Sequence, residues 1–401
     1  MLTKAFIPYK GYYSSPFTRW QGSLANENSI ILASETAKSW LETKNFNPDI
    51  FDYLILGVTI GQPHIFYGGP WASALIGAQN IPGSLISQAC STSTSVLFQA
   101  AIGVETGFYK NVFTLMTDRC SNGPHTIWPN PNGPGGQVVS ENWLMDNFNT
   151  DPWANNPMIQ TAENVAKENN IIKKQCDDLT LRRYEQYMDA LAHDNKFQKK
   201  YMFPLSIKIS KKKTITIKTD EGIMPCTREG LNNLKPVLPN GVHTFGSQTH
   251  PADGNCGLIV TTREKAGELS QNKAKDVRIV SYGFSRAKRG FMAMAVVPAA
   301  QMALDRAGIS IDDVKVIKTH NPFAANDIYL ADQMNIDVNT FNNFGSSLIF
   351  GHPQAPTAGR LIIEGIEELT DKGGGYMLFT GCAAGDTGAA LVLKQVNEIN
   401  R

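Results

Sequence analysis

The sequence has little net charge, few cysteines and no long apolar run. Lysine and arginine number 37 against 36 aspartates and glutamates, giving a net charge of +1, so composition offers no case for nucleic-acid or anionic-membrane binding. No apolar run reaches spanning length, and the first residues lack the apolar segment of a signal peptide. We therefore expect a cytoplasmic protein without nucleic-acid or membrane partners.

The cysteines are too scattered to suggest a metal or redox motif. There are six, with no Cys-x-x-Cys pair and no closely spaced histidine pair beside them. In a reducing compartment they are free thiols, and most such residues pack in the interior. The sequence therefore predicts neither a metal site nor a redox cofactor.

What the chain does have is length, apolar residues and a repeated layout. With 401 residues, 42% of them hydrophobic and 18% charged, it is expected to form two or three domain-sized units with a sizeable core. Residues 34–60 and 297–319 each read as an amphipathic helix, an acidic loop and a buried strand. Pro298 and Gly308 bound the second helix. The shared layout predicts two duplicated halves.

A second unit repeats in the same order. Strands are expected at 84–89 and 346–350, helices at 92–106 and 357–369, and further strands at 111–116 and 376–380. Strands alternating with helices predict an α/β fold with predominantly parallel sheets and helices on both faces. Ligands of such sheets bind at the carboxyl ends of the strands, where Cys90, His320, His352 and Cys382 fall.

A spacing links four residues of the two halves. Cys90 and Cys120 are 30 residues apart, and the same interval separates His352 from Cys382. A cysteine at the start of a helix is favoured as the thiolate, and a histidine held on a turn before Pro353 could take its proton. Taken singly, Cys90 and Cys382 are more often packing or turn residues, and His352 is as often a hydrogen-bonded turn histidine as a functional one. The paired arrangement favours one site between the halves, with Cys120 structural.

Residues 119–250 differ from both halves and are expected to form an insertion. The stretch contains a Pro- and Gly-rich segment, a helical region at 175–193 and a lysine-rich segment at 199–218. We predict three parts: a first half of residues 1–118 with 251–272, a loop domain of residues 119–250, and a second half of residues 273–401.

Several motifs in order resemble those of the thiolase family. Residues 88–93 (Gln-Ala-Cys-Ser-Thr-Ser) resemble its nucleophile motif, residues 351–360 its Gly-His-Pro motif, and residues 382–388 its C-terminal cysteine motif. Residues 161–166 match a signature within its loop domain, and Asp253-Gly254 match the return from that domain. The resemblance implies two duplicated βαβαβαββ halves in a five-layer α-β-α-β-α arrangement, with a loop-domain insertion that binds CoA and substrate.

The resemblance also implies catalytic roles. Cys90 would be the acylated nucleophile, His352 its base, and Cys382 the group that moves a proton on or off the α-carbon of the second acyl group. The backbone N–H groups of Cys90 and Ala384 would form one oxyanion hole, and His352 with a water near His320 the other. Coenzyme A would be a substrate, contacted by Thr249, Ser247 and Phe323. Its phosphates would meet basic residues of the insertion; Arg182 and Arg228 are candidates, and the choice stays open.

Departures from the family pattern surround the expected acyl pocket. His320-Asn321-Pro322-Phe323 replaces the usual Asn-Glu-Ala-Phe and resembles sterol-carrier-type thiolases. Alanines 355 and 384 stand where glycines are expected. These changes leave room for a longer, branched or aromatic acyl group, such as a benzoylsuccinyl-CoA-type substrate. The insertion's aromatic residues could line its pocket: Trp128, Trp143, Trp153 and Phe148.

The resulting prediction is an acyl-CoA C-acyltransferase that cleaves a 3-oxoacyl-CoA with CoA, or runs the reverse Claisen condensation. A decarboxylating ketoacyl synthase is the first alternative, disfavoured by Cys382, because those enzymes normally carry His or Asn in that role. A non-catalytic scaffold subunit is the second, disfavoured by the retention of Cys90 and His352 with Cys382. The family pattern implies a homodimer or homotetramer, and a small acyl-CoA-binding partner subunit is a further candidate.

Overall fold

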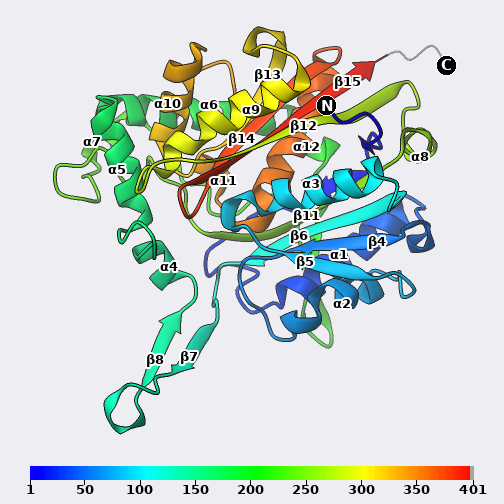
Figure 1. Ribbon diagram of the computed structural model, residues 1–401, viewed down its shortest axis with the longest axis horizontal. Coiled ribbons are helices and arrows are strands. Elements are labelled where there is room, and N and C mark those ends of the chain that lie inside the picture. The colour runs from blue at the N-terminus through cyan, green and yellow to red at the C-terminus, as the bar shows by residue number, and fades with distance from the viewer. Residues whose placement is uncertain (398–401) are drawn as a thin grey trace.

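Two α/β halves lie side by side in the computed structural model, which describes residues 1–397 (Figure 1). Strand-to-strand hydrogen bonds run continuously through both, in the order β13-β14-β15-β12-β1-β11-β6-β4-β5. The strands of the first half are β4 (Tyr53–Gly57), β5 (Gly83–Ile86), β6 (Asn111–Arg119) and β11 (Ala252–Thr261). Those of the second are β12 (Lys275–Arg286), β13 (Val314–His320), β14 (Gly375–Ala383) and β15 (Thr387–Asn397). The short strand β1 (Phe6–Ile7) joins them by pairing with β11 and β12.

Helices form three layers around these strands. The inner layer is α3 (Thr92–Glu105) and α12 (Ala355–Asp371), which pack on each other and touch strands of both halves. Outer layers are α1 (Ser29–Thr43) and α2 (Gly68–Leu75) on the first half, and α9 (Val296–Ala307) with α10 (Ala324–Met334) on the second. Helix α12 is buried all round, as expected of a helix between two sheets. The predicted five-layer α/β fold is confirmed.

The expectation of predominantly parallel sheets is wrong. Strand β4 pairs in parallel with β5 and β6, and β13 with β14, but β6–β11, β14–β15 and β15–β12 are antiparallel. A turn of three residues joins β14 to β15, and so short a connection only permits an antiparallel hairpin. The sheets are therefore mixed.

The strand expected at 346–350 is also wrong, because this segment is the helical turn α11 (Ser347–Phe350). A short buried apolar run has no periodicity that separates a strand from one turn of helix. Its counterpart in the first half, β5, is a strand. The two halves therefore differ at the element that leads to the histidine turn.

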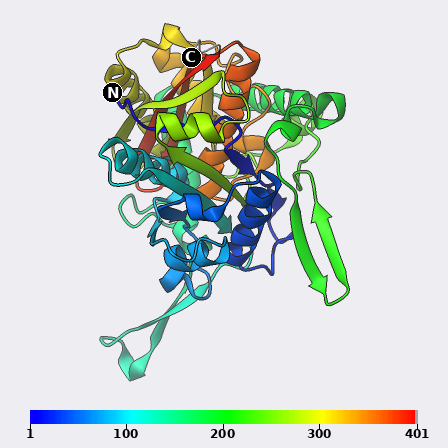
Figure 2. The same cartoon turned by 90° about the vertical axis from the view of Figure 1, so that its right-hand side faces the viewer.

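The segment between β6 and β11 carries two hairpins and four helices, and the β7–β8 hairpin projects far from the body (Figures 1 and 2). Its elements are β7 (His125–Pro129), β8 (Val138–Asn142), α4 (Met145–Asn149), α5 (Met158–Glu168), α6 (Lys173–Asn195), β9 (Leu205–Ser210), β10 (Lys213–Ile217) and α7 (Arg228–Asn233). Helix α6 packs on α10 and α11, which ties this segment to the second half. Across residues 1–397 no helix combines the length and apolarity that a membrane crossing requires.

Candidate active site

Cys90 lies in a tight helical turn (Ala89–Ser91) between β5 and the start of α3. Ala89 has a φ of 44°, a left-handed conformation that is costly for a residue with a Cβ and that recurs at functional sites. The half-buried Cys90 thiol donates a hydrogen bond to Gln354 Oε1 at 3.3 Å. The turn thus presents the sulfur to the second half of the chain.

The expectation that this position favours the thiolate is wrong for the free protein. Burial raises the pKa of the Cys90 thiol to about 12, although the backbone N–H groups of Ala384 and of Cys90 itself lower it. Desolvation therefore outweighs the donors, and the sulfur carries its proton at neutral pH. The two N–H groups that lower the pKa are those predicted to form an oxyanion hole.

Two buried histidines face Cys90 from the second half. His320 is the last residue of β13, and His352 follows α11 and Gly351, whose φ is 90°. Their ring centroids are 4.1 Å apart, and a ring nitrogen of each lies within 4.8 Å of the other and of Cys90 Sγ. The fold therefore brings together three of the four predicted catalytic residues.

Each imidazole is oriented by a hydroxyl at Nδ1. His320 Nδ1 is 2.9 Å from Ser347 Oγ, and His352 Nδ1 is 2.6 Å from Thr357 Oγ1. Both Nε2 atoms are buried and have no hydrogen-bond partner among the described residues. Burial lowers the pKa of His320 to about 3, and burial together with His320 lowers the pKa of His352 well below its usual range. Both rings are neutral, with Nε2 free for chemistry.

Because both histidine rings are buried and neutral, we expect the folded protein to be less stable in mild acid than at neutral pH. Unfolded histidine titrates near about 6.5, whereas both folded pKa values lie lower. Below that pH the unfolded chain binds more protons, so stability falls as the pH falls. The expected loss is about 1.4 kcal/mol per histidine between roughly pH 7.5 and 5.5. In urea unfolding at both pH values, His320→Asn should reduce the acid-induced loss in the free energy of unfolding by the contribution of one histidine. A pH dependence equal to that of the wild type would contradict this.

Cys382, the fourth predicted catalytic residue, is buried in β14. Asn326 Nδ2 donates to its Sγ at 3.1 Å. Burial and the nearness of Cys90 raise the pKa of Cys382 above its usual value, while the Asn326 amide lowers it. The turn between β14 and β15 is held by the segment between β6 and β11, because Gly385 N–H donates to Asp151 Oδ2 at 3.2 Å. Cys382 is therefore a protonated thiol close to Cys90.

Four contacts to these residues were missed from the sequence: Gln354 at Cys90, Ser347 at His320, Thr357 at His352 and Asn326 at Cys382. Gln354 and Thr357 lie in the same turn motif as His352, so their proximity was a usable signal. Gln354 also has a φ of 55°, which marks a strained turn. The contacts of Ser347 and Asn326 depend on tertiary packing and left no local signal.

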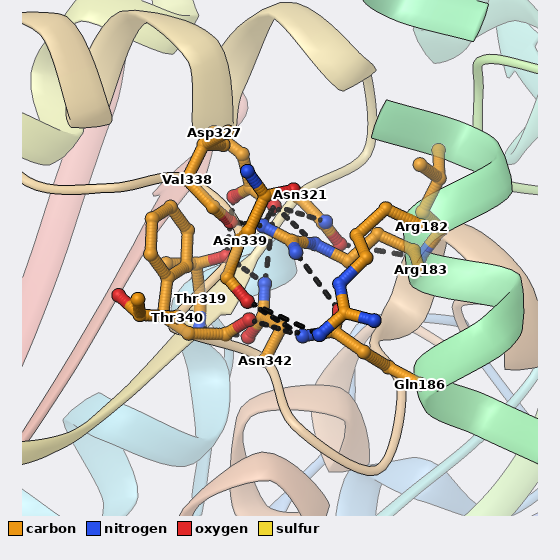
Figure 3. Close-up of polar contacts among 12 residues, drawn as sticks. Arg182, Arg183, Gln186, Thr319, Asn321, Asp327, Val338, Asn339, Thr340 and Asn342 are labelled. Atoms are coloured by element: carbon orange, nitrogen blue, oxygen red, sulfur yellow. Dashed lines mark hydrogen bonds and ion pairs between the residues drawn. The ribbon is translucent and has the colours of Figure 1, made fainter. Parts of the chain in front are cut away.

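A buried polar network connects Asn321, the residue that follows His320 in the chain, to Arg183 of α6 (Figure 3). Asn321 Oδ1 accepts from Ser347 Oγ at 3.2 Å, and Asn321 Nδ2 donates to Asp327 Oδ2 at 2.7 Å. Arg183 then reaches from α6 to the same Asp327 carboxylate, with Nε and Nη2 at 3.0 and 2.9 Å. Neither side chain of this ion pair is exposed. The network fixes Asn321, which follows His320 at the end of β13 and accepts from Ser347 at the start of α11.

Removing Arg183 is expected to destabilise the protein strongly. Arg183→Met would leave the Asp327 carboxylate buried without its cation, a change that typically costs about 3–5 kcal/mol. The matched control is Arg182→Met, because the neighbouring side chain is 36% exposed, and its replacement should stay within about 0.5 kcal/mol. Urea unfolding measures both. Equal stabilities of the two variants would show that the buried pair contributes nothing.

The residues expected to contact CoA lie in two places. Ser247, Thr249 and Phe323 are adjacent: Thr249 N–H donates to Pro322 O, and Ala324 N–H to Ser247 O. The Thr249 hydroxyl donates to Ser347 O at 2.6 Å, so this group adjoins the histidines. Arg182 is on α6, and Arg228 of α7 pairs with Asp178 of α6. The two arginines therefore flank one partly exposed face of α6.

The aromatic residues expected around the acyl group do not form one cluster. Trp128 belongs to the projecting β7–β8 hairpin and is 48% exposed, so it lines no pocket of the body (Figure 1). Trp153 faces Arg286 and Arg289, with its ring 5.2 and 5.4 Å from their guanidinium carbons. Phe148 packs near Cys120, which is 1% exposed and buried with Ile60 and Leu144. Trp143 also contacts the body, because its Nε1–H donates to Thr59 O at 3.0 Å. Trp143, Phe148 and Trp153 are thus the aromatic candidates that remain near the body.

Comparison with known proteins gives a consistent family match. A model described as "Thiolase, N-terminal domain" matches residues 11–264, and one described as "Thiolase, C-terminal domain" matches residues 273–395. The human mitochondrial 3-ketoacyl-CoA thiolase is 25% identical over 386 residues, covering 95% of this chain and 96% of its own. The crystal structure of the Bacillus anthracis acetyl-CoA acetyltransferase superposes with a TM-score of 0.90 at 23% identity, covering 98% and 99% of the two chains. That of the human mitochondrial thiolase in complex with CoA gives 0.87 at 23% identity, covering 98% of each.

Proposed function

The chain belongs to the thiolase family of acyltransferases, and on this premise we propose that it cleaves a 3-oxoacyl-CoA with CoA through an acyl-enzyme on Cys90. The observation that carries the proposal is the convergence of Cys90 Sγ with one ring nitrogen each of His320 and His352 within 4.8 Å. Nucleophilic catalysis by a thiol needs a base within reach, and buried neutral imidazoles supply one.

Formation of the acyl-enzyme follows from the protonation states. The Cys90 thiol keeps its proton at neutral pH, so His352 Nε2 must accept it as the sulfur attacks the 3-keto carbon. This requires His352 Nδ1–H to donate to Thr357 Oγ1, which leaves the lone pair on Nε2. The backbone N–H groups of Cys90 and Ala384 would hold the oxyanion that forms at this carbon.

Carbon–carbon cleavage then releases the second acyl-CoA as its enolate. Cys382 would give its thiol proton to the α-carbon, with Asn326 Nδ2 stabilising the resulting thiolate through the 3.1 Å contact. The thioester oxygen would be held by His352 and by a water bound at His320 Nε2. The proton held by His352 would then pass to the Cys382 thiolate. CoA would finally attack the thioester carbonyl of acylated Cys90, and its thiol proton would pass through His352 to the departing Cys90 sulfur.

The finer features of the substrate and assembly belong to the same proposal. Ser247, Thr249 and Phe323 would contact the pantetheine arm, with the CoA phosphates near Arg182 and Arg228 in the 119–250 loop domain. Their support is the adjacency of the first three to Ser347 and the exposure of both arginines. Three further features remain predictions from the sequence: a bulky or aromatic acyl group, a cytoplasmic homodimer or homotetramer, and a small acyl-CoA-binding partner.

Product analysis separates this proposal from its alternatives. Incubation with CoA and a panel of 3-oxoacyl-CoAs, including aromatic ones, should yield two shorter acyl-CoAs in equal amounts, measured by chromatography. A decarboxylating synthase would instead release CO₂ from malonyl-CoA without consuming CoA. Turnover of malonyl-CoA alone would therefore refute the proposal, and no turnover of any substrate would favour the scaffold alternative.

A further inference from the structure

The fold brings together three possible metal ligands that are far apart in the sequence and form no metal-binding motif there. Cys90, His320 and His352 offer one sulfur and two ring nitrogens, all within 4.8 Å of one another. The Nδ1 atoms are hydrogen-bonded to Ser347 and Thr357, so the Nε2 atoms are the ones available as ligands. Both Nε2 atoms are buried and unpartnered among the described residues, and the two histidines are 1% and 4% exposed. Unpartnered buried nitrogens of this kind call for a ligand.

The set matches the chemistry of zinc. Zn²⁺ takes thiolate and imidazole ligands at about 2.3 and 2.0 Å, which places one sulfur and two nitrogens of a tetrahedral site roughly 3.3–3.6 Å apart. The sulfur and one nitrogen of each ring therefore need to close by at most about 1.5 Å from the observed 4.8 Å limit. Metal-bound histidines usually donate the other ring N–H to an oxygen that orients them, and the Ser347 and Thr357 hydroxyls occupy those positions.

We propose that Cys90, His320 and His352 bind one Zn²⁺ reversibly and that the bound metal switches the acyltransferase off. Binding forms a bond between the metal and Cys90 Sγ, and the thiol proton is released to solvent. Two Nε2–Zn bonds form at the same time, and the fourth position is left to water or chloride. The metal then occupies the nucleophile's sulfur and the base's nitrogen, so no acyl-enzyme can form. The inhibition rests on the proposed function, whereas metal binding stands without it.

Cobalt is the spectroscopic probe for this site, because Co²⁺ accepts the same ligands as Zn²⁺ and absorbs visible light. One equivalent of Co²⁺ added to the reduced full-length protein without oxygen should give cobalt–thiolate charge-transfer absorption and strong tetrahedral d–d bands. One equivalent of Zn²⁺ should abolish both, because zinc binds such sites more tightly. Absence of the charge-transfer band with equimolar Co²⁺ would overturn the proposal.

Variants assign the ligands. Cys90→Ser should lose the charge-transfer band, and His320→Asn should lose the tetrahedral intensity. Ser347→Ala should weaken Zn²⁺ binding by about 10–100-fold, as loss of a ligand-orienting partner does. The matched control is Cys226→Ser, which replaces a half-buried thiol outside the site and should leave the spectrum unchanged. A band that survives in Cys90→Ser or disappears in Cys226→Ser would refute the assignment.

A measurement on the unmodified protein guards against variants that fail to fold. One equivalent of Zn²⁺ should protect Cys90 from iodoacetamide, as read by peptide mapping, and a chelator should restore labelling. The same zinc should block acylation by an acyl-CoA. Acylation without any zinc protection would refute the metal site and leave the proposed function intact. Zinc protection in a protein that never becomes acylated would refute the inhibition and the proposed function and leave the metal site standing.

Discussion

Cys90→Ser is expected to lower CoA-dependent cleavage of a 3-oxoacyl-CoA by about 10³-fold or more, because a serine hydroxyl is a far weaker nucleophile at neutral pH. The base adds to this loss. The pKa of His352 lies well below the usual range, so its ring is a weak base, and it accepts a proton from a thiol far more readily than from the less acidic hydroxyl of serine. The measurement is kcat for cleavage, with loss of the acyl-enzyme as a second readout.

The control for this variant is Cys226→Ser, which should retain wild-type cleavage. Urea unfolding of both proteins excludes a folding defect as the cause. A Cys90→Ser protein that folds and cleaves within about tenfold of the wild-type rate would be incompatible with covalent catalysis at this sulfur.

Cys382→Ser should separate carbon–carbon cleavage from acyl transfer between Cys90 and CoA. Its thiol is proposed to protonate the departing α-carbon, and loss of a positioned acid typically costs about 10²–10⁴-fold. Cleavage of 3-oxoacyl-CoA should fall by that amount. Exchange of labelled CoA with a simple acyl-CoA needs only Cys90 and His352, and it should stay within about threefold. Equal losses in both assays would assign Cys382 a structural role instead.

Much of the fold could be predicted from the sequence because its signals are local. The helix expected at 92–106 is α3 (Thr92–Glu105), and that expected at 357–369 lies within α12 (Ala355–Asp371). Capping Pro and Gly residues and helical periodicity depend on neighbours in the chain. By contrast, α11 was mistaken for a strand, because four buried residues carry no period. The antiparallel strands were missed because pairing direction depends on how distant segments return.

The proximity of the candidate site residues could be predicted from the sequence, but their electrostatics could not. The repeated interval and the motifs selected Cys90, His352 and Cys382 as candidates, and the fold places Cys90 and His352 together with His320. Sequence position suggested a thiolate at Cys90, yet burial dominates and raises its pKa to about 12. Desolvation depends on every segment that covers a group, so no local pattern reports it. The same reason hid the metal-ligand set, whose three residues come from distant parts of the chain.

The most direct test of covalent catalysis is the mass of the protein after brief incubation with a panel of acyl-CoAs, followed by peptide mapping. We expect one chain to gain the mass of one acyl group, and the modified peptide to contain Cys90. The acyl-CoA that labels fastest would also identify the acyl class. No mass gain with any member of the panel, or an acyl group mapped to a cysteine other than Cys90, would contradict the proposed mechanism.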